Sequence, residues 1–302
     1  MLFPPFDPTR SEHRRRRFRA IPVRTLVPNV ITLLALCAGL TAIRFAVEGR
    51  LEWALAAIVF AAVLDGIDGR VARLIKGQSR FGAELDSLAD FVNFGVAPGV
   101  ILYFWGLREL GNVGWIAAMV FAICAGLRLA RFNVAIDDPN RPAWAANFFT
   151  GMPAPAGAIT VLLPIYINFV GVPFSGLMAA LALIYTLVIA ILMVSRLPVF
   201  SGKKVGTRVA PEAVLPIFVV VVLFVALLIS YPWPVLTVGT LCYLLSLPFG
   251  WLSYRRYQHA AAPSREAAEP TPAHAHEASK PDAASVRPPA DTPDSDRPAR
   301  LN

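Results

Sequence analysis

The sequence is poor in charge and in histidine. Only 16% of its 302 residues are charged, against about a quarter in a typical soluble domain, while 56% are hydrophobic. The three cysteines stand in separate apolar stretches and match neither a disulfide framework nor a metal site, so we expect small buried packing residues. Every histidine lies near an end of the chain: His13, His259, His274 and His276. An active site in the middle of the chain must therefore use a residue other than histidine as its base.

Long apolar stretches fill the middle of the sequence. A helix needs about 20 apolar residues to cross a bilayer, and we find about eight stretches near this length. The sequence therefore predicts an all-α, polytopic membrane helical bundle of about eight transmembrane helices. These predicted helices lie near residues 27–47, 52–74, 83–105, 112–132, 153–170, 174–194, 213–230 and 233–252.

Basic residues gather on one side of these predicted helices. A run from Arg14 to Arg24 precedes the first helix, and later clusters such as Lys76 with Arg80 fall on the same side when eight helices are threaded. The positive-inside rule then places both termini and this side in the cytoplasm, with the protein in a prokaryotic-type inner (cytoplasmic) membrane. The arginines either only set this topology or also attract anionic lipid heads.

Composition divides the chain into three regions. Residues 1–24 form a basic cytoplasmic arm, and residues 25–256 form the membrane domain. Residues 257–302 are rich in Ala and Pro and nearly lack large apolar side chains. Such a segment cannot bury enough surface to offset the entropy of ordering, so we expect a disordered cytoplasmic tail.

Four aspartates surround the predicted connection between the second and third helices. Asp65 and Asp68 are three residues apart near the end of one helix, and Asp86 and Asp90 are four apart near the start of the next. Each spacing places its pair on one helical face. Because a short connection makes the two helices antiparallel, we expect the four carboxylates to converge.

A group of acids at a membrane surface needs compensation. One acid inside a spanning helix costs roughly 2.5–3.5 kcal/mol, and close like charges cannot all stay ionised unaided. Carboxylates with no nearby His or Cys favour Mg²⁺ or Mn²⁺, and two such divalent cations can clamp a diphosphate. The alternative is a set of ordinary helix-end acids paired with the basic residues between them, which are Arg70, Arg73, Lys76 and Arg80.

Small and basic residues lie among these acids. Gly66 and Gly69 are one turn apart and are poor helix formers, so their value lies in close approach by a ligand or a neighbouring backbone. Ala72 is small on the same side, and Arg73 can pair with a phosphate. Gly82 lies one turn before the third acid.

The whole pattern is Asp-x2-Asp-Gly-x2-Ala-Arg-x8-Gly-x3-Asp-x3-Asp, running from Asp65 to Asp90. It resembles the signature of the CDP-alcohol phosphatidyltransferase family. The resemblance covers about residues 24–250, with one departure at Asn93, where serine is more often expected. The flanking segments are similar to the membrane-embedded branch that uses serine as its acceptor, and they are FGAELDSLADFVNFGVAPG (81–99), LRLARFN (127–133), FTGMPAPA (149–156) and MVSRLPVF (193–200).

The resemblance implies a fold, substrates and roles. The family fold has six core transmembrane helices, to which this chain adds two, and a homodimer is expected. The implied substrates are CDP-diacylglycerol and L-serine, with membrane lipids as surroundings and no nucleic acid as partner. By resemblance, Asp65, Asp68, Asp86 and Asp90 hold metal, and Asp90 is also the base.

The resemblance also implies a binding site for the CDP-lipid head. Gly69, Arg73 and Ser79 match positions that contact this head, and Ala72 and Gly82 belong to the same motif. From the residues alone, Ser79 reads equally as a solvated loop serine.

A second basic group is a candidate for binding the acceptor. Arg128, Arg131 and Asn133 lie at the cytoplasmic end of the fourth predicted helix. Arginine suits bidentate capture of a carboxylate, so these residues are candidates for binding serine. The alternatives are anchoring by the positive-inside rule or binding of a lipid phosphate. The same alternatives apply to Arg196, Lys203 and Lys204, for which anchoring is favoured.

Three other functions remain open. Another member of the same family would use a different acceptor, such as glycerol phosphate or inositol phosphate. A divalent-cation transporter would also carry intramembrane acids, although it predicts acids spread along the membrane depth, whereas here they cluster. A non-catalytic scaffold would tolerate loss of all four aspartates.

Overall fold

The computed structural model describes residues 23–77, 79–136, 148–195, 198–200 and 211–248, and most of them are helical. The basic arm and the tail lie outside these ranges, so the predictions for them stay predictions. The elements are α1 (Val23–Val47), α2 (Leu51–Leu74), α3 (Arg80–Asp90), the π-helix η1 (Phe91–Val96), α4 (Ala97–Trp105), the 3-10 helix η2 (Leu107–Leu110), α5 (Asn112–Ile136), β1 (Phe148–Thr150), α6 (Ala154–Val161), α7 (Leu163–Val170), α8 (Gly176–Val194), β2 (Pro198–Phe200), α9 (Pro211–Ser230) and a further helix over 232–248.

Each of the eight predicted membrane stretches is helical in the described part of the chain. By length and composition, five helices there are long and apolar enough to cross a membrane: Leu26–Val47, Arg80–Trp105, Asn112–Ala135, Gly176–Val194 and Ala213–Ser230. The 154–170 segment is shorter. Several apolar helices of this length are typical of an integral membrane protein. The predicted all-helical membrane class is therefore confirmed.

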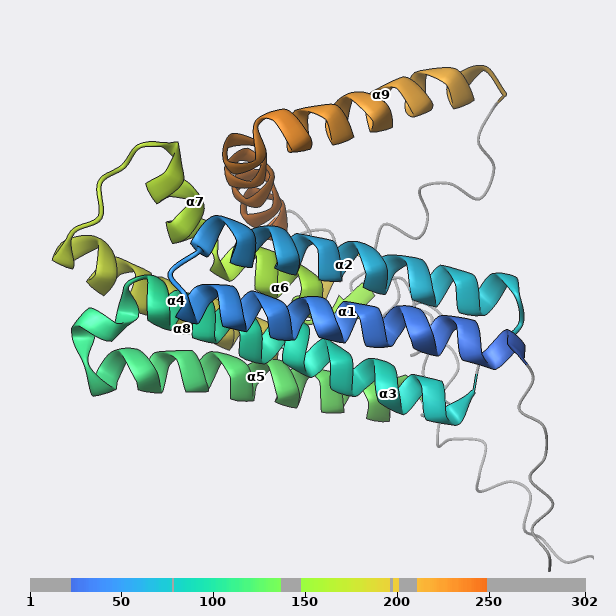
Figure 1. Cartoon of the computed structure of the whole chain (residues 1–302), viewed down its shortest axis with the longest axis horizontal. Helices are drawn as coiled ribbons and strands as arrows, with labels where there is room; N and C mark the ends of the chain where they lie inside the picture. Colours follow the sequence, from blue (N-terminus) through green and yellow to red (C-terminus); the bar gives the residue numbers. More distant parts are fainter. Residues whose placement is uncertain (1–22, 78, 137–147, 196–197, 201–210, 249–302) are drawn as a thin grey trace, which may run out of the picture. The chain divides into compact units, whose positions relative to one another are not determined.

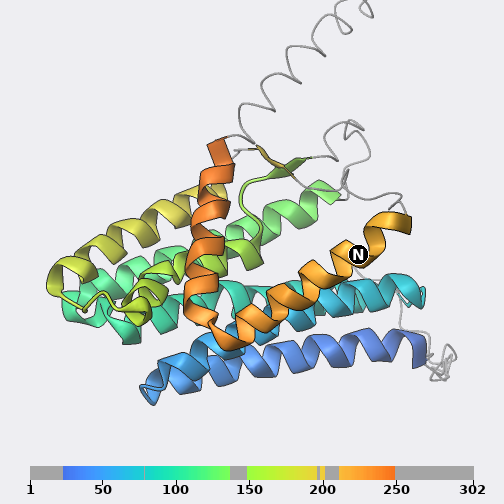
Figure 2. The same ribbon diagram turned by 90° about the horizontal axis from the view of Figure 1, so that it is seen from above.

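The helices pack as an antiparallel bundle around α1, α2, η1 and α5. Figures 1 and 2 both show α1 and α2 side by side, and α5 lies against α8. Fully buried aromatic and aliphatic side chains such as Phe94, Phe121 and Tyr166 form the core. Small residues let the backbones approach, as in membrane bundles generally. A methyl group added at Gly99 would lie only 2.9 Å from the carbonyl oxygen of Ala118 on α5.

Two predicted helices are interrupted in the structure. The 83–105 stretch begins earlier, at Arg80, and contains the π-helix η1 directly after Asp90. The 153–170 stretch divides at Leu162 into α6 and α7, two residues before Pro164, a residue that cannot donate to the preceding turn. The first interruption is followed at once by Pro98, but the apolar pattern continues through it, so apolar periodicity alone missed it.

A short antiparallel ribbon joins two segments that are far apart in the sequence. The backbone of Phe148 pairs with that of Phe200, and Thr150 pairs with Pro198. Gly151 follows β1 with φ +82° and packs against backbone oxygens at the end of α8, where a side chain would collide with the Met193 carbonyl at 2.6 Å. The ribbon therefore ties the start of α6 to the end of α8.

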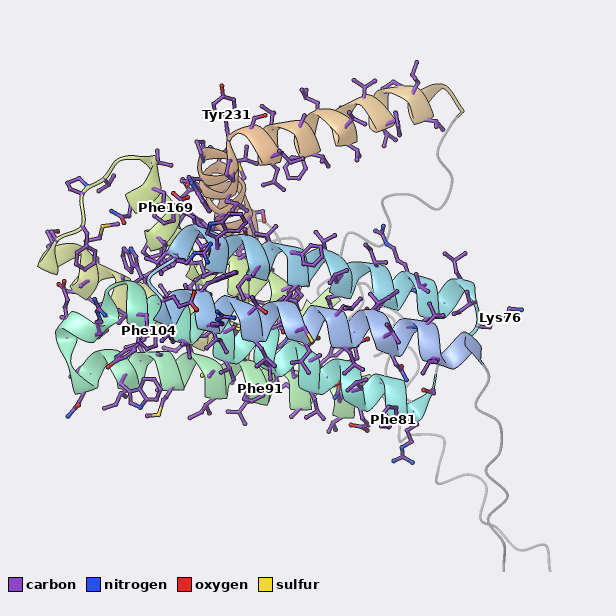
Figure 3. All side chains as sticks on the ribbon, viewed as in Figure 1. Lys76, Phe81, Phe91, Phe104, Phe169 and Tyr231 are labelled. Atoms are coloured by element: carbon purple, nitrogen blue, oxygen red, sulfur yellow. The ribbon has the colours of Figure 1, made fainter. Side chains whose placement is uncertain are left out.

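Apolar side chains cover the outer surface of the helices (Figure 3), as expected where lipid is the solvent. Along α9, large apolar side chains are exposed from Val214 to Ile229. The prediction of buried cysteines is wrong for Cys37 and Cys242, which are exposed on this surface, while Cys124 is half-buried. A cysteine behaves as a small apolar residue, so an outward, lipid-facing position suits it as well as a core position.

Candidate active site

The last turns of α2 and the first turns of α3 meet beside a short connection. Figure 3 shows Lys76 and Phe81 at this end of the bundle. Lys76 has a left-handed backbone conformation, with φ 51°, which reverses the chain between the two helices. The reversal brings the acidic ends of both helices to one place.

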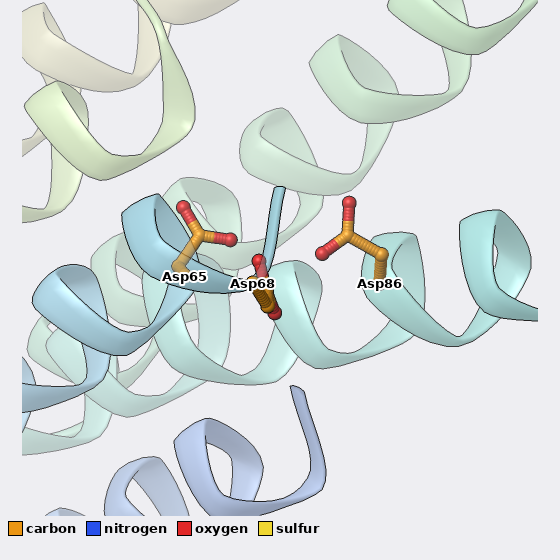
Figure 4. Close-up of side chains that lie close together, drawn as sticks. All are labelled: Asp65, Asp68 and Asp86. Carbon is orange, nitrogen blue, oxygen red and sulfur yellow. The ribbon is translucent and has the colours of Figure 1, made fainter. Parts of the chain in front are cut away.

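Three of the four predicted acids come together there. Asp65 and Asp68 project from α2, and Asp86 projects from α3 toward them (Figure 4). One carboxylate oxygen from each lies within 4.8 Å of the other two. The spacing of three residues within α2 and the antiparallel entry of α3 together produce this cluster, which we call the acidic cluster.

Asp90 lies one turn beyond Asp86 on α3. Its carboxyl interacts with that of Asp65, so it extends the acidic cluster toward the centre of the bundle. Directly after it the backbone widens into η1, and such single π-helical turns are frequent at functional sites. Asp90 also lies within electrostatic reach of Arg128 on α5.

Thr32 on α1 holds one acid in place. Its hydroxyl lies 2.7 Å from Oδ2 of Asp68, and it also lies 3.1 Å from the carbonyl oxygen of Pro28. A hydroxyl has one proton, so it donates to one acceptor at a time, and an ionised carboxylate is the stronger acceptor. Both Thr32 and Asp68 are buried. Sequence analysis missed Thr32, because a threonine in an apolar helix carries no local signal.

Ion pairs do not compensate these acids. Among the described side chains, the ion pairs within 4.0 Å are Arg44 with Glu48 and Arg50 with Glu48, at the other end of α1 and α2. The basic residues between the acids, Arg70, Arg73, Lys76 and Arg80, are exposed. The alternative of helix-end acids paired with neighbouring bases therefore does not describe this cluster.

The cluster has the donor set of a hard-metal site. Its ligand atoms are all carboxylate oxygens, which suit Mg²⁺ or Mn²⁺ better than a metal that prefers nitrogen or sulfur. A positive ion between the three carboxylates would also remove their mutual repulsion. The residues present thus fit a divalent metal.

A cavity of about 630 Å³ opens beside the acidic cluster, between α1, α2 and α3. This volume is typical of a site for a small molecule or cofactor. Asp68 and Asp86 line it, and Thr32 contributes from α1. All five residues predicted to contact the CDP-lipid head also line it: Gly69, Ala72, Arg73, Ser79 and Gly82.

Ser79 has a structural contact in addition to its place in the cavity. It is the N-cap residue of α3, and its Oγ accepts a hydrogen bond of 3.0 Å from the backbone N–H of Gly82. Gly82 in turn packs against α1, since a methyl group there would lie 2.7 Å from Oδ1 of Asn29. Asn29 is a second cavity residue that sequence analysis missed.

The three acceptor candidates on α5 have different surroundings. Arg128 is only 7% exposed, and its guanidinium carbon lies 5.2 Å from the centre of the Phe132 ring. Arg131 is exposed and donates to the carbonyl oxygen of Val194 at the end of α8. Asn133 donates a hydrogen bond of 2.9 Å to Oγ of Ser87, the neighbour of Asp86. Arg128 is thus the one whose charge is buried near the acids.

The chain is similar to known proteins over most of its length. The chain matches the CDP-alcohol phosphatidyltransferase family over residues 25–252. It is 43% identical over 239 residues to the CDP-diacylglycerol–serine O-phosphatidyltransferase of Mycobacterium leprae, covering 78% of this chain and 77% of that protein. The proteins of the same name from Mycobacterium tuberculosis and Helicobacter pylori are 42% and 34% identical, over 76% and 75% of this chain and 79% and 91% of theirs.

Proposed function

The chain belongs to the CDP-alcohol phosphatidyltransferase family, and on this basis we propose that it transfers the phosphatidyl group of CDP-diacylglycerol to L-serine. The products are phosphatidylserine and CMP. The observation that carries the proposal is the acidic cluster beside a cavity, since three carboxylates within 4.8 Å are suited to a metal-bound diphosphate. The names of relatives from three bacteria support serine as the acceptor.

We assign the metal ligands to Asp65, Asp68, Asp86 and Asp90, with two divalent cations, Mg²⁺ or Mn²⁺. Bound there, such ions would neutralise the diphosphate and the charge that develops on its oxygens. Thr32 fixes Asp68 by its hydrogen bond, so one carboxylate of the set enters the reaction already oriented.

The CDP-lipid head occupies the cavity between α1, α2 and α3. Gly69, Ala72 and Gly82 leave room for it because they carry little or no side chain. Arg73 pairs with a phosphate oxygen, and Ser79 lines the same cavity. The exposed apolar flanks of α1 and α2 leave the acyl chains in the surrounding lipid.

Asp90 acts as the base. It accepts the proton of the serine hydroxyl while the serine oxygen forms a bond to the phosphorus that carries diacylglycerol. The bond from this phosphorus to the bridging oxygen breaks, and CMP leaves with that oxygen. Arg128 on α5 lies within electrostatic reach of Asp90 and orients the acceptor. Arg131 and Asn133 have a supporting role, because they donate hydrogen bonds to the Val194 carbonyl and to the Ser87 hydroxyl.

The remaining assignments are a location and an assembly. We propose that this end of the bundle faces the cytoplasm at an inner membrane, with both termini on the same side, and the exposed basic residues of the α2–α3 turn support this orientation. We propose a homodimer, as the family resemblance implies.

The test is release of CMP from CDP-diacylglycerol by the purified protein with Mg²⁺ or Mn²⁺. L-serine, glycerol phosphate and inositol phosphate are each supplied as the acceptor. We expect metal-dependent release with L-serine and little with the other two. Release with another acceptor instead would assign a different family activity, and transport of the cation without CMP release would indicate a carrier.

A further inference from the structure

Arg128 is a buried cation that no carboxylate contacts directly among the described residues, although Asp90 lies within electrostatic reach. The residue is 7% exposed, and its Nε has no hydrogen-bond partner in the described part of the chain. It also takes part in none of the ion pairs found there. A buried guanidinium whose Nε–H is unsatisfied carries a desolvation cost, which an anion that binds from outside the chain would offset. The partner that suits a guanidinium is an anion with two oxygens.

The helix over 232–248 brings a second unpaired donor to the same place. Tyr243 packs against the core, and its hydroxyl is buried without a hydrogen-bond partner among the described residues. It lies within electrostatic reach of Arg128. Thr240, three residues earlier and thus on the same face, likewise has a buried unpaired hydroxyl. Buried polar atoms in native structures nearly always have a partner, so a set of three needs an explanation.

We infer that Arg128 and Tyr243 form the subsite that binds the carboxylate of the amino-acid acceptor. The inference rests on the proposed function and extends it, because it assigns a specificity-determining residue to a helix outside the acidic motif. A carboxylate between the two side chains accepts from the guanidinium on one oxygen and from the phenol on the other. Thr240 supplies a further hydroxyl on the same face of the helix.

The position of Asp90 makes this subsite productive. Arg128 is within electrostatic reach of both the proposed base, Asp90, and the Tyr243 phenol, so the three groups belong to one neighbourhood. In serine, two carbons separate the carboxylate from the hydroxyl. An acceptor held by its carboxylate at Arg128 and Tyr243 therefore presents its hydroxyl on the Asp90 side. An acceptor without a carboxylate would leave the Arg128 guanidinium and the Tyr243 hydroxyl without a hydrogen-bond partner. The cost of these unpaired donors weakens its binding relative to serine.

The experiment compares Tyr243→Phe with wild-type protein in the CMP-release assay. We expect the KM for L-serine to rise about tenfold, as for loss of one hydrogen bond to a charged group, with the KM for CDP-diacylglycerol unchanged. Ethanolamine lacks the carboxylate, so we expect it to react slowly and at the same rate in both proteins. Tyr185→Phe is the matched control, because it removes a buried hydroxyl that donates to the Thr160 carbonyl, away from this subsite.

Several outcomes would overturn the inference. An unchanged KM for L-serine in Tyr243→Phe would remove the phenol from the subsite, and an equal rise for both substrates would indicate a merely structural role. If Tyr243→Phe does not fold, Arg128→Lys replaces it, since lysine keeps the charge and loses the planar fork. Wild-type protein that releases no CMP with L-serine would instead refute the proposed function, so the two failures are distinguishable.

Discussion

The two sides of the site are built on opposite principles. On the α2–α3 side, three carboxylates lie within 4.8 Å of one another, and two of them line a cavity that reaches exposed arginines. On the side of α5 and the 232–248 helix, one buried arginine stands among aromatic rings with its Nε unpaired. One side gathers negative charge for cations and a diphosphate, and the other isolates a single positive charge. The difference suggests that metal binding and acceptor recognition can be altered separately.

Asp90 lies where the two sides meet, and its loss should have the largest effect. Asp90→Asn keeps the size of the side chain and removes its basicity. We expect turnover to fall by about 10²–10⁴, the usual contribution of a general base, while CDP-diacylglycerol still binds. CMP release and equilibrium binding of the CDP-lipid measure the two effects. Near-normal turnover would take Asp90 out of the base role.

Thr32 tests the α2–α3 side alone. Thr32→Val removes the hydrogen bond to Asp68 and should weaken Mn²⁺ binding about 10- to 100-fold, the usual cost of losing an outer partner of a metal ligand. Titration of Mn²⁺ followed by electron paramagnetic resonance gives the affinity without turnover. Thr32→Ser should restore it. Thr186→Val is a matched control, since Thr186 is equally buried but donates within its own helix, to Ala182.

Gly39 tests how tightly α1 packs against η1, the segment that follows Asp90. A methyl group at Gly39 would overlap the Asn93 side chain, so Gly39→Ala should destabilise the protein by about 1–3 kcal/mol, the cost of overpacking. Thermal unfolding in detergent should show a lower Tm. Gly239→Ala should leave Tm unchanged or raise it, because nothing lies within 4 Å of the added methyl group. Equal Tm values for Gly39→Ala and wild type would contradict the packing.

Ser79 gives the smallest expected effect and separates two roles. Ser79→Ala removes the cap of α3 and should cost about 1 kcal/mol of stability, which Ser79→Asn should recover. If the KM for CDP-diacylglycerol rises in Ser79→Ala while Tm is unchanged, the hydroxyl contacts the lipid head and does not stabilise the helix. A change in neither quantity would dismiss both roles.

The sequence could predict the side of the site that is local in the chain. The acids from Asp65 to Asp90 span one helix–turn–helix, so helical periodicity was enough to bring their faces together. Thr32 and Tyr243 come from helices far away in the chain, and each stands in an apolar stretch where one hydroxyl is unremarkable. The π-helix at Phe91–Val96 escaped because Gly95 within it and Pro98 just after it do not interrupt the apolar pattern from which the helix was predicted.

One consequence concerns how the protein enters its membrane. Within the described part of the chain, α2 is not among the five helices apolar enough to cross alone, since it carries Glu52 and the charged residues from Asp65 to Arg73. Its most extensive partner is α1, which meets the apolar criterion and precedes it in a helical hairpin with a short turn. Insertion of α2 therefore depends on its neighbour, and the chemistry of the site sets a requirement on biogenesis: α1 and α2 must be integrated together.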